Sequence, residues 1–159
     1  MKNSNIIKQV IAGGVLLVIG ASIGWNYYLS TPSGTINQIK STADKGDYEA
    51  FKNCCFDESL VFENIRQDIN NSLEEGEGIL YREVVNDEIE LAKTGFKADF
   101  SQSKLFNEIS ADTIAKTDNG FTIEAKGKAG NTNLITFQDM NKGRFSFANY
   151  KIVEIKTVD

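Results

Sequence analysis

The longest uncharged stretch of the chain lies near its N-terminus and constrains the fold more than any other feature. Residues 10–29 (VIAGGVLLVIGASIGWNYYL) contain no charged side chain, and extending the window to residue 6 adds only one charge, that of Lys8. About 20 helical residues, rising about 1.5 Å each, cross the roughly 30 Å hydrocarbon layer of a bilayer. The stretch therefore predicts one transmembrane helix. Its diagnostic residues are Val10, Leu16, Leu17, Ile19, Gly20, Gly24 and Trp25.

The charges on either side of this stretch predict its orientation. Lys2, Lys8 and the amino terminus precede it, whereas the next charge is Lys40. Because positive charge stays on the cytoplasmic side of a membrane, we expect a cytoplasmic N-terminus and a single pass through the cell membrane. The predicted organisation is a cytoplasmic stub and signal anchor in residues 1–29, followed by an extracytoplasmic domain in residues 30–159.

Aromatic residues mark the far end of the stretch. Trp25, Tyr27 and Tyr28 stand where an aromatic belt would meet the outer interface of the bilayer. A cleaved signal peptide is the alternative, but such peptides have a shorter apolar core and end in an A-x-A-like site, for which residues 22–24 are a poor match. We therefore favour a retained anchor, with the lipid bilayer as a partner.

Two glycines allow a further interaction of this helix. Gly20 and Gly24 are four residues apart, a small-x-x-x-small spacing that lets two transmembrane helices approach closely. A homodimer through the helix is therefore a hypothesis, although glycine is common in such helices in any case.

The composition excludes several classes of function. The 159 residues include no histidine, so Ser-His-Asp and Cys-His catalytic groups and histidine-containing zinc sites are absent. A net charge of −5 argues against a nucleic-acid partner. No phosphate-binding or dinucleotide-binding glycine motif occurs. An EF-hand-like start at Asp68, Asn70 and Ser72 lacks the required glycine and final glutamate, so we expect neither a cofactor nor a metal.

Apolar residues at helical spacing predict four helices after the anchor, and a short helical turn is expected at residues 104–109. Thr31 and Pro32 open the first, which ends at Lys45-Gly46, and Asp47 opens a short second helix through Cys55. Asp57 opens the third. We expect the third helix to end at residue 73 and the fourth to span residues 79–94 or 79–95.

The periodicity changes after Ser110 and predicts strands. Asp118-Asn119-Gly120 is a tight-turn sequence and joins two strands into a hairpin. The expected strands are residues 113–117, 121–126, 134–137 and a last one from residue 144 or 147 to residue 156. The predicted fold class is α+β, with three to five helices packed on a C-terminal antiparallel meander of about four strands.

This order of parts resembles a family of bacterial membrane-anchored or exported proteins of unknown function. The likeness rests on Thr31-Pro32, the helix after it, the segment at residues 45–51 and the Asp57-led helix. The family looks like the NTF2-like or cystatin-like superfamily, which implies helices packed into a curved sheet to form a cone with an interior pocket. Cys54-Cys55-Phe56 departs from the aromatic, apolar and acidic run expected there. The resemblance implies a fold and no activity.

The adjacent cysteines are a possible redox site. Cys54 and Cys55 have Cα atoms about 3.8 Å apart, below the usual disulfide range. The chain has no C-x-x-C motif and no histidine to lower a thiol pKa. We favour structural thiols, with a vicinal or an intermolecular disulfide as the alternatives.

Acidic residues are concentrated in the middle of the chain. Residues 57–90 hold eleven of them against only Arg66 and Arg82. A solvated helix face is the preferred interpretation, and a surface for a basic partner or a divalent ion is the alternative. The eleven are Asp57, Glu58, Glu63, Asp68, Glu74, Glu75, Glu77, Glu83, Asp87, Glu88 and Glu90.

These observations favour a binding function. We expect a membrane-anchored extracytoplasmic interaction module without catalysis, which takes a partner protein or a small apolar ligand in its concave sheet. One alternative is a pocket enzyme that uses carboxylates and tyrosine, and another is a structural subunit of an envelope complex. A cavity with an acid beside a tyrosine would favour the enzyme, and a filled interior would favour the structural subunit. The candidates for catalysis are Tyr48, Tyr81, Asp99 and Tyr150.

Overall fold

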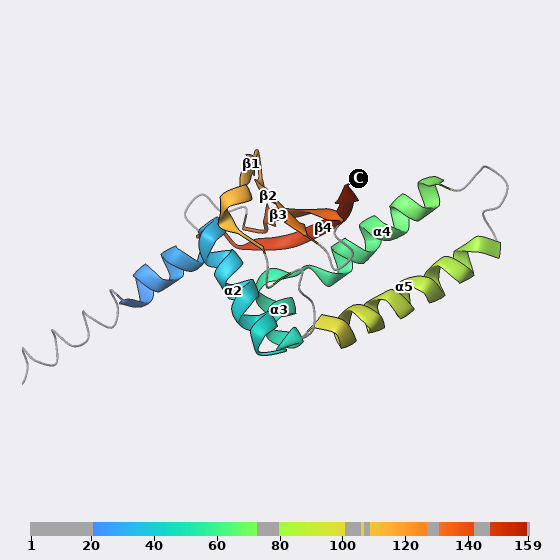
Figure 1. The fold of residues 1–159 in the computed structure, drawn as a ribbon, viewed down its shortest axis with the longest axis horizontal. Coiled ribbons are helices and arrows are strands. Elements are labelled where there is room, and N and C mark those ends of the chain that lie inside the picture. Colours follow the sequence, from blue (N-terminus) through green and yellow to red (C-terminus); the bar gives the residue numbers. More distant parts are fainter. Residues whose placement is uncertain are drawn as a thin grey trace, which may run out of the picture.

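The protein is an α+β domain in which helices come first and an antiparallel sheet follows (Figure 1). The computed structural model describes residues 21–72, 80–100, 106, 109–126, 131–141 and 147–158. Residues 21–29 are helical and lead into the first named helix. The helices are α2 (Pro32–Asp44), α3 (Tyr48–Cys55), α4 (Glu58–Ser72), α5 (Leu80–Asp99) and the short 3₁₀ helix η2 (Ala111–Thr113). The strands are β1 (Ala115–Thr117), β2 (Gly120–Lys126), β3 (Thr132–Asp139) and β4 (Tyr150–Val158).

The predicted fold class needs one correction. Within the described residues, no helix has both the length and the apolar character needed to cross a membrane. Of the residues that predicted this helix, Gly24 and Trp25 lie in the helical segment at residues 21–29. The α+β class and the four-stranded meander are confirmed, whereas the described part of the chain does not contain the transmembrane helix that was predicted as part of the fold. Its other diagnostic residues, Val10, Leu16, Leu17, Ile19 and Gly20, lie outside the described residues.

The helix starts follow the predicted capping residues. Thr31 Oγ1 accepts a hydrogen bond from Gly34 N at 3.1 Å, and Pro32 occupies the first position of α2. Asp47 Oδ1 accepts from Ala50 N at 3.0 Å in α3, and Asp57 Oδ1 accepts from Leu60 N at 3.0 Å in α4. Each side chain satisfies a backbone N–H that has no partner within its helix.

Helix α5 continues to Asp99, past its predicted end at Thr94 or Gly95. Glycine inside a helix costs about 1 kcal/mol relative to alanine. The residues beyond it offset this cost by packing. Phe96 stacks on Phe56 at 5.2 Å between ring centroids, and Phe100 lies 4.6 Å from Phe51.

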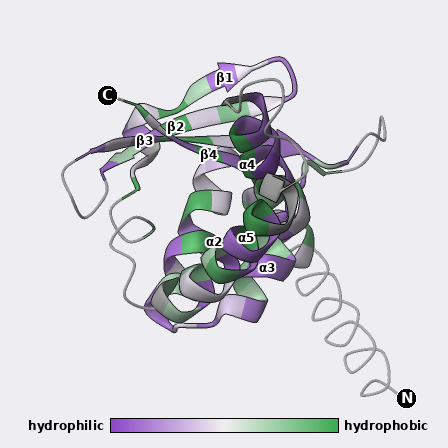
Figure 2. Ribbon diagram, turned by 90° about the vertical axis from the view of Figure 1, so that its right-hand side faces the viewer, coloured by the Kyte–Doolittle hydropathy of each residue, from purple (hydrophilic) through white to green (hydrophobic). Residues whose placement is uncertain are grey.

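The sheet has the order β1-β2-β3-β4, with every neighbouring pair antiparallel. Residues on β2 alternate in burial because successive side chains point to opposite faces. A register shift at Thr136/Phe137 marks an irregularity opposite β4. β4 begins at Tyr150, later than the predicted residue 144 or 147. The helices lie on one face of this sheet (Figure 2).

The two edges of the sheet differ. Beyond β4, Phe56 forms a parallel bridge with Ile152, and Asp57 N donates to Ile152 O at 3.0 Å. Asn64 Nδ2, from α4, donates to Val153 O at 2.9 Å. At the other edge, β1 is three exposed residues long and pairs only with β2.

Aromatic side chains fill the space between the helices and the sheet. Their ring centroids lie 4.6 to 5.8 Å apart within the group Phe51, Phe56, Phe100 and Phe106. On the sheet, Phe121 and Phe137 stack at 4.3 Å across β2 and β3. Phe106, from the predicted helical turn at residues 104–109, is helical and fully buried, while residues 104, 105, 107 and 108 lie outside the described residues.

Candidate functional site

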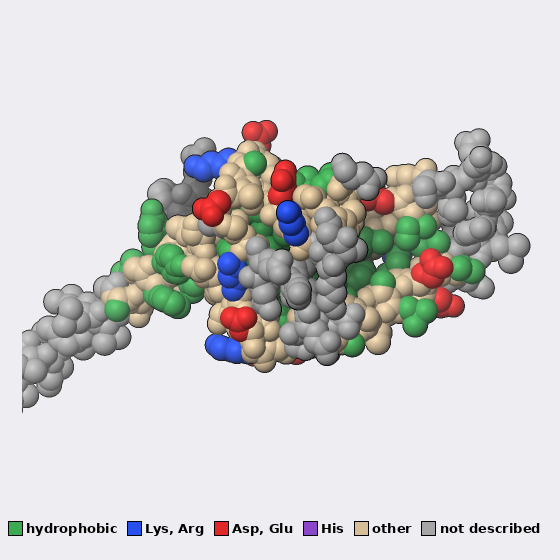
Figure 3. All heavy atoms as spheres, viewed as in Figure 1, with side chains coloured by type: hydrophobic (Ala, Val, Ile, Leu, Met, Phe, Trp, Pro, Cys, Tyr) green, Lys and Arg blue, Asp and Glu red, His purple; other side chains and the backbone are tan. Residues whose placement is uncertain are grey.

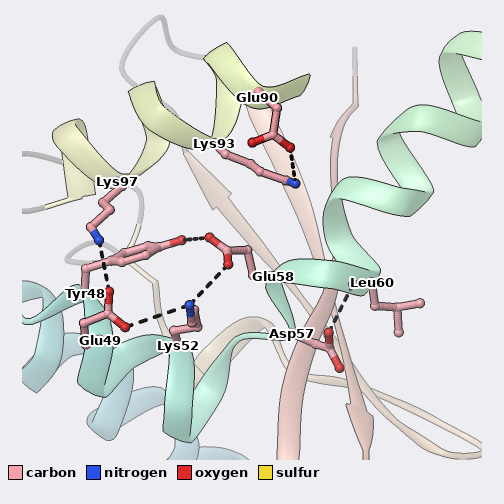
Figure 4. A network of polar contacts seen from close by, with 9 residues as sticks. All are labelled: Tyr48, Glu49, Lys52, Asp57, Glu58, Leu60, Glu90, Lys93 and Lys97. Atoms are coloured by element: carbon pink, nitrogen blue, oxygen red, sulfur yellow. Dashed lines mark hydrogen bonds and ion pairs between the residues drawn. The ribbon is translucent and has the colours of Figure 1, made fainter. Parts of the chain in front are cut away.

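A tyrosine and a carboxylate meet where α3, α4 and α5 approach one another (Figure 4). Tyr48 Oη donates to Glu58 Oε1 at 2.7 Å, and Lys52 Nζ lies 3.4 Å from Glu58 Oε2. Glu49 is within ion-pair distance of both Lys52 (3.9 Å) and Lys97 (3.0 Å). Tyr48 itself is buried, with its ring against Phe51, Phe96 and Phe100.

The surroundings of this pair move the pKa values of both side chains further away from neutral pH. Burial raises the pKa of Tyr48 well above its usual range, and the hydrogen bond to Glu58 raises it further. For Glu58, burial acts to raise the pKa, but the hydrogen bonds from Tyr48 and Lys52 outweigh it and hold the pKa below its usual value. A general acid or base works best when its pKa lies near the working pH. The shifts therefore suit a structural hydrogen bond that joins two helices.

The structure does not gather the four candidate catalytic residues into one place. Tyr48 lies in the helix cluster, whereas Tyr150 begins β4 and lies against Phe121 at 5.1 Å. The side chains of Tyr81 and Asp99 lie outside the described residues. The pairing of an acid with a tyrosine therefore rests on Tyr48 and Glu58, and neither of them lines the two hollows described next.

The larger hollow is at one end of the sheet, and we call it the sheet-end hollow. Its volume is about 650 Å³. The β1–β2 turn, the end of β3 and the first residue of β4 meet there, beside the first residue of α2. Antiparallel hairpins bring these segments to the same end because the chain reverses at each turn. Its lining is Pro32, Lys116, Thr117, Asp118, Asn119, Gly120, Gln138, Asp139, Asn141 and Tyr150.

Local hydrogen bonds set the shape of the sheet-end hollow. Asp139 Oδ1 accepts from Asn141 N at 3.0 Å and from Asn149 N at 2.8 Å, so this carboxylate closes the β3–β4 loop. Asp139 N donates to Asn119 O at 2.8 Å and ties that loop to the β1–β2 turn. Gly120 lies so close to the Phe137 carbonyl that a Cβ would collide with it. The side chains left to face the hollow are mainly amides and hydroxyls, which bind polar groups.

The smaller hollow, of about 250 Å³, has one of the two adjacent cysteines, Cys54, in its wall. Cys54 and Cys55 form a vicinal disulfide with their Cα atoms 3.8 Å apart, in place of the free thiols that the sequence favoured. Cys55 is fully buried, and its Sγ lies 3.8 Å from Gln38 Oε1. Cys54 is part-buried and lines the hollow with Gln38 and Tyr150.

Four of the acidic residues in the segment 57–90 form ion pairs, namely Glu58, Glu63, Asp68 and Glu90. Glu63 binds Arg66 at 2.7 Å, and Glu90 binds Lys93 at 2.7 Å. The described residues hold no group of three or more possible metal ligands. The positions that exclude an EF-hand, residues 73 and 79, lie outside the described part, so that exclusion stays a prediction.

The sequence analysis did not predict the sheet-end hollow, because it assigned the lining residues to separate elements. Residues 118–120 and 141 were assigned to turns, and Gln138 and Asp139 to none of the predicted elements. The available signal was topological, since an antiparallel meander places the first turn and the end of the third strand at one end of the sheet. Amide-rich segments at both positions could have identified the hollow.

Comparisons with protein-family models, with curated proteins and with solved structures give no match for the chain. The resemblance to exported proteins with an NTF2-like domain therefore stays an untested prediction. The fold and the geometry of the hollows are the basis for any functional proposal.

Proposed function

We propose that the domain is a non-catalytic binding module that takes a polar segment of a partner protein in the sheet-end hollow. The observation that carries the proposal is the contrast between a filled interior and an open, polar surface hollow. Phenylalanine rings occupy the space in which a concave sheet would hold a small apolar ligand. The hollow presents Asn119, Gln138 and Asn141 instead.

The free edge of the sheet supports a protein partner. Lys116 and Thr117 belong to β1 and also line the sheet-end hollow. An exposed edge strand presents backbone donors and acceptors with which an extended polypeptide can pair. A peptide segment could therefore bond to β1 and place its polar side chains in the hollow.

The Tyr48–Glu58 pair gives no support to the alternative of a pocket enzyme. Its geometry resembles that of an acid–base pair, but Glu58 is held ionised and Tyr48 protonated at neutral pH. A structural subunit of an envelope complex remains compatible with the proposal, because such a subunit also binds partners. The location of residues 30–159 outside the cell stays a prediction.

Site-specific photo-crosslinking in cells tests the proposal. A photoreactive amino acid replaces Asn119 in the hollow or, as a control, Asn86, which is also an exposed asparagine but lies on α5. We expect a discrete crosslinked product from position 119 only, and its loss when Gln138→Arg fills the hollow. Identical products from both positions, no product, or a product insensitive to Q138R would contradict the proposal.

A further inference from the structure

A cluster of exposed aromatic side chains surrounds the point where the helical residues 21–29 join the domain. Figure 3 shows apolar side chains gathered at this end of the molecule. Trp25 is 62% exposed, Tyr27 is 64% exposed and Phe147, from the loop before β4, is 47% exposed. We call this surface the aromatic collar, and its members are Ile23, Trp25, Tyr27, Tyr28 and Phe147.

The collar contains two ring pairs, and one of them joins segments that are far apart in the sequence. The rings of Tyr27 and Phe147 meet edge to face, with their centroids 6.4 Å apart. Trp25 and Tyr28 lie 6.0 Å apart on the helix. Contiguous exposed apolar surface of this kind marks an interaction site, whereas single exposed apolar residues do not.

Hydrogen bonds fix the helix side of the collar to the domain. Thr31 Oγ1 donates to Tyr28 O at 2.7 Å, and Thr35 Oγ1, which is buried, donates to Leu29 O at 3.4 Å. The Asn37 side-chain amide also bonds to the Tyr28 hydroxyl. Gly34 lies so close to the Tyr28 carbonyl that no side chain would fit between them. The helix therefore leaves the domain in a defined direction.

The loop side of the collar is fixed in the same way. Asn141 Nδ2 donates to Phe147 O at 2.7 Å. Met140 N donates to Asn149 O at 2.9 Å, and Asp139 holds the same loop through Asn141 N and Asn149 N. The exposed Phe147 ring thus sits on a hydrogen-bonded support beside Tyr27.

The chemistry of the collar indicates the kind of partner that it contacts. No charged residue lies between Lys8 and Lys40, so the helix at residues 21–29 has no charged side chain on any face. A helix that is surrounded by water normally has charged or polar residues on the face that points away from the core. Tryptophan and tyrosine concentrate at the boundary between lipid and water, where a ring meets apolar chains and its polar atom meets headgroups. The residues that directly precede the helix in the sequence, 10–20, are uncharged and mostly apolar as well.

We propose that the aromatic collar seats the domain on the surface of a lipid bilayer, with Trp25, Tyr27 and Phe147 at the level of the headgroups. The proposal concerns the surface of the bilayer and needs no membrane-spanning helix. Phe147, Asn141 and Tyr150 line the smaller hollow, and the last two also line the sheet-end hollow. Seating on the collar would therefore place both hollows close to the membrane surface.

The single tryptophan of the chain allows a direct test. Trp25→Phe combined with Phe147→Trp moves the fluorophore to the loop side of the collar, outside the N-terminal helix. The full-length variant is reconstituted into vesicles of phosphatidylcholine and phosphatidylglycerol that contain lipids brominated near the headgroup. Seating predicts a blue-shifted emission and about twofold quenching relative to unbrominated vesicles.

The matched control moves the tryptophan to α5 by combining W25F with Leu91→Trp, because Leu91 is a single apolar residue with 71% exposure. We expect no quenching at this position. The proposal is overturned if F147W is not quenched or if L91W is quenched equally. It is also overturned if Tyr27→Ser leaves the quenching at position 147 unchanged. A third contrary result is an F147W emission that is already blue-shifted in lipid-free protein that crosslinks as a dimer, because a second copy of the chain would then cover the collar.

Discussion

The helix at residues 21–29 lies at one end of the molecule, and α4 and α5 extend toward the other (Figure 1). The aromatic collar at the first end leaves its rings exposed, and its polar side chains bond to backbone carbonyl groups. On α4 and on α5, charged side chains form ion pairs within each helix. Ser30 Oγ donates to Tyr27 O at the collar, but Glu63 and Arg66 form an ion pair on α4. The collar therefore does not lack polar residues. They fix its shape, and its outward surface is left apolar.

The largest expected effect comes from the core that joins the two ends. Phe51→Ala removes a ring that is fully buried against Phe56, Phe100 and Phe106. We expect a loss of about 3–5 kcal/mol in the free energy of unfolding, measured by urea denaturation. Phe147→Ala at the collar is the control, and we expect a change within about 0.5 kcal/mol in lipid-free solution. Similar losses for both variants would show that Phe147 is part of the core.

A pair of glycines tests the junction at the collar end. Gly34→Ala places a Cβ against the Tyr28 carbonyl, so we expect a destabilisation of about 1–3 kcal/mol and a changed Trp25 emission. Gly24→Ala is the control on the collar helix, because a Cβ there has nothing within 4 Å. A neutral Gly34→Ala would mean that the helix is not held against α2.

The Tyr48–Glu58 bond tests the charged end. Glu58→Gln removes a charge-assisted hydrogen bond, and we expect a loss of about 1–2 kcal/mol at neutral pH. Because folding lowers the pKa of Glu58, its stabilisation is present above the usual carboxylate pKa of about 4.3 and is lost as the pH falls through the lower folded value. Denaturation from pH 7 to pH 2 should therefore show the two proteins converging at low pH.

Two further expected results make this pH test specific. Glu63→Gln, which removes an exposed pair with Arg66, should change stability by less than about 0.5 kcal/mol. The raised pKa of Tyr48 predicts that its contribution is complete below a usual tyrosine pKa of about 10 and is lost only as the pH rises through the higher folded value. A difference between wild type and E58Q that persists at pH 2 would contradict the assignment.

The smallest expected effect is a gain in stability. Gly95→Ala lies in α5, where a Cβ has open space around it. Alanine favours the helix over the unfolded chain, so we expect a stabilisation of about 0.5–1 kcal/mol in the same urea assay. Destabilisation would indicate that Gly95 marks a bend that α5 requires.

Local signals in the sequence predicted most elements of the fold, because they depend on neighbouring residues alone. Thr31, Asp47 and Asp57 cap the helices that they were expected to cap, and Asp118-Asn119 forms the expected turn. The continuation of α5 past Gly95 was missed because Phe96 and Phe100 gain their packing from distant residues. The late start of β4 was missed for a similar reason, since Asp139 holds the preceding loop.

The candidate site was less predictable than the fold. The sheet-end hollow combines residues 116–120 with residues 138, 139 and 141, and only the sheet topology brings them together. The prediction of a transmembrane helix counted the uncharged residues 10–29, of which the structure describes residues 21–29, and the described residues hold no helix that is long and apolar enough to span a bilayer. Phe147 could not be joined to the collar from sequence, because its contact with Tyr27 depends on the fold.

The covered edge of β4 has a consequence for the solubility of this protein at high concentration. Phe56, Asp57 and Asn64 bond to the β4 backbone at Ile152 and Val153, so an incoming strand cannot pair with this part of the edge. A β-aggregate grows by strand pairing at both edges of each molecule, and among the described strands the fully uncovered edge is the three-residue β1. Strand pairing between molecules should therefore favour pairs of molecules over fibrils.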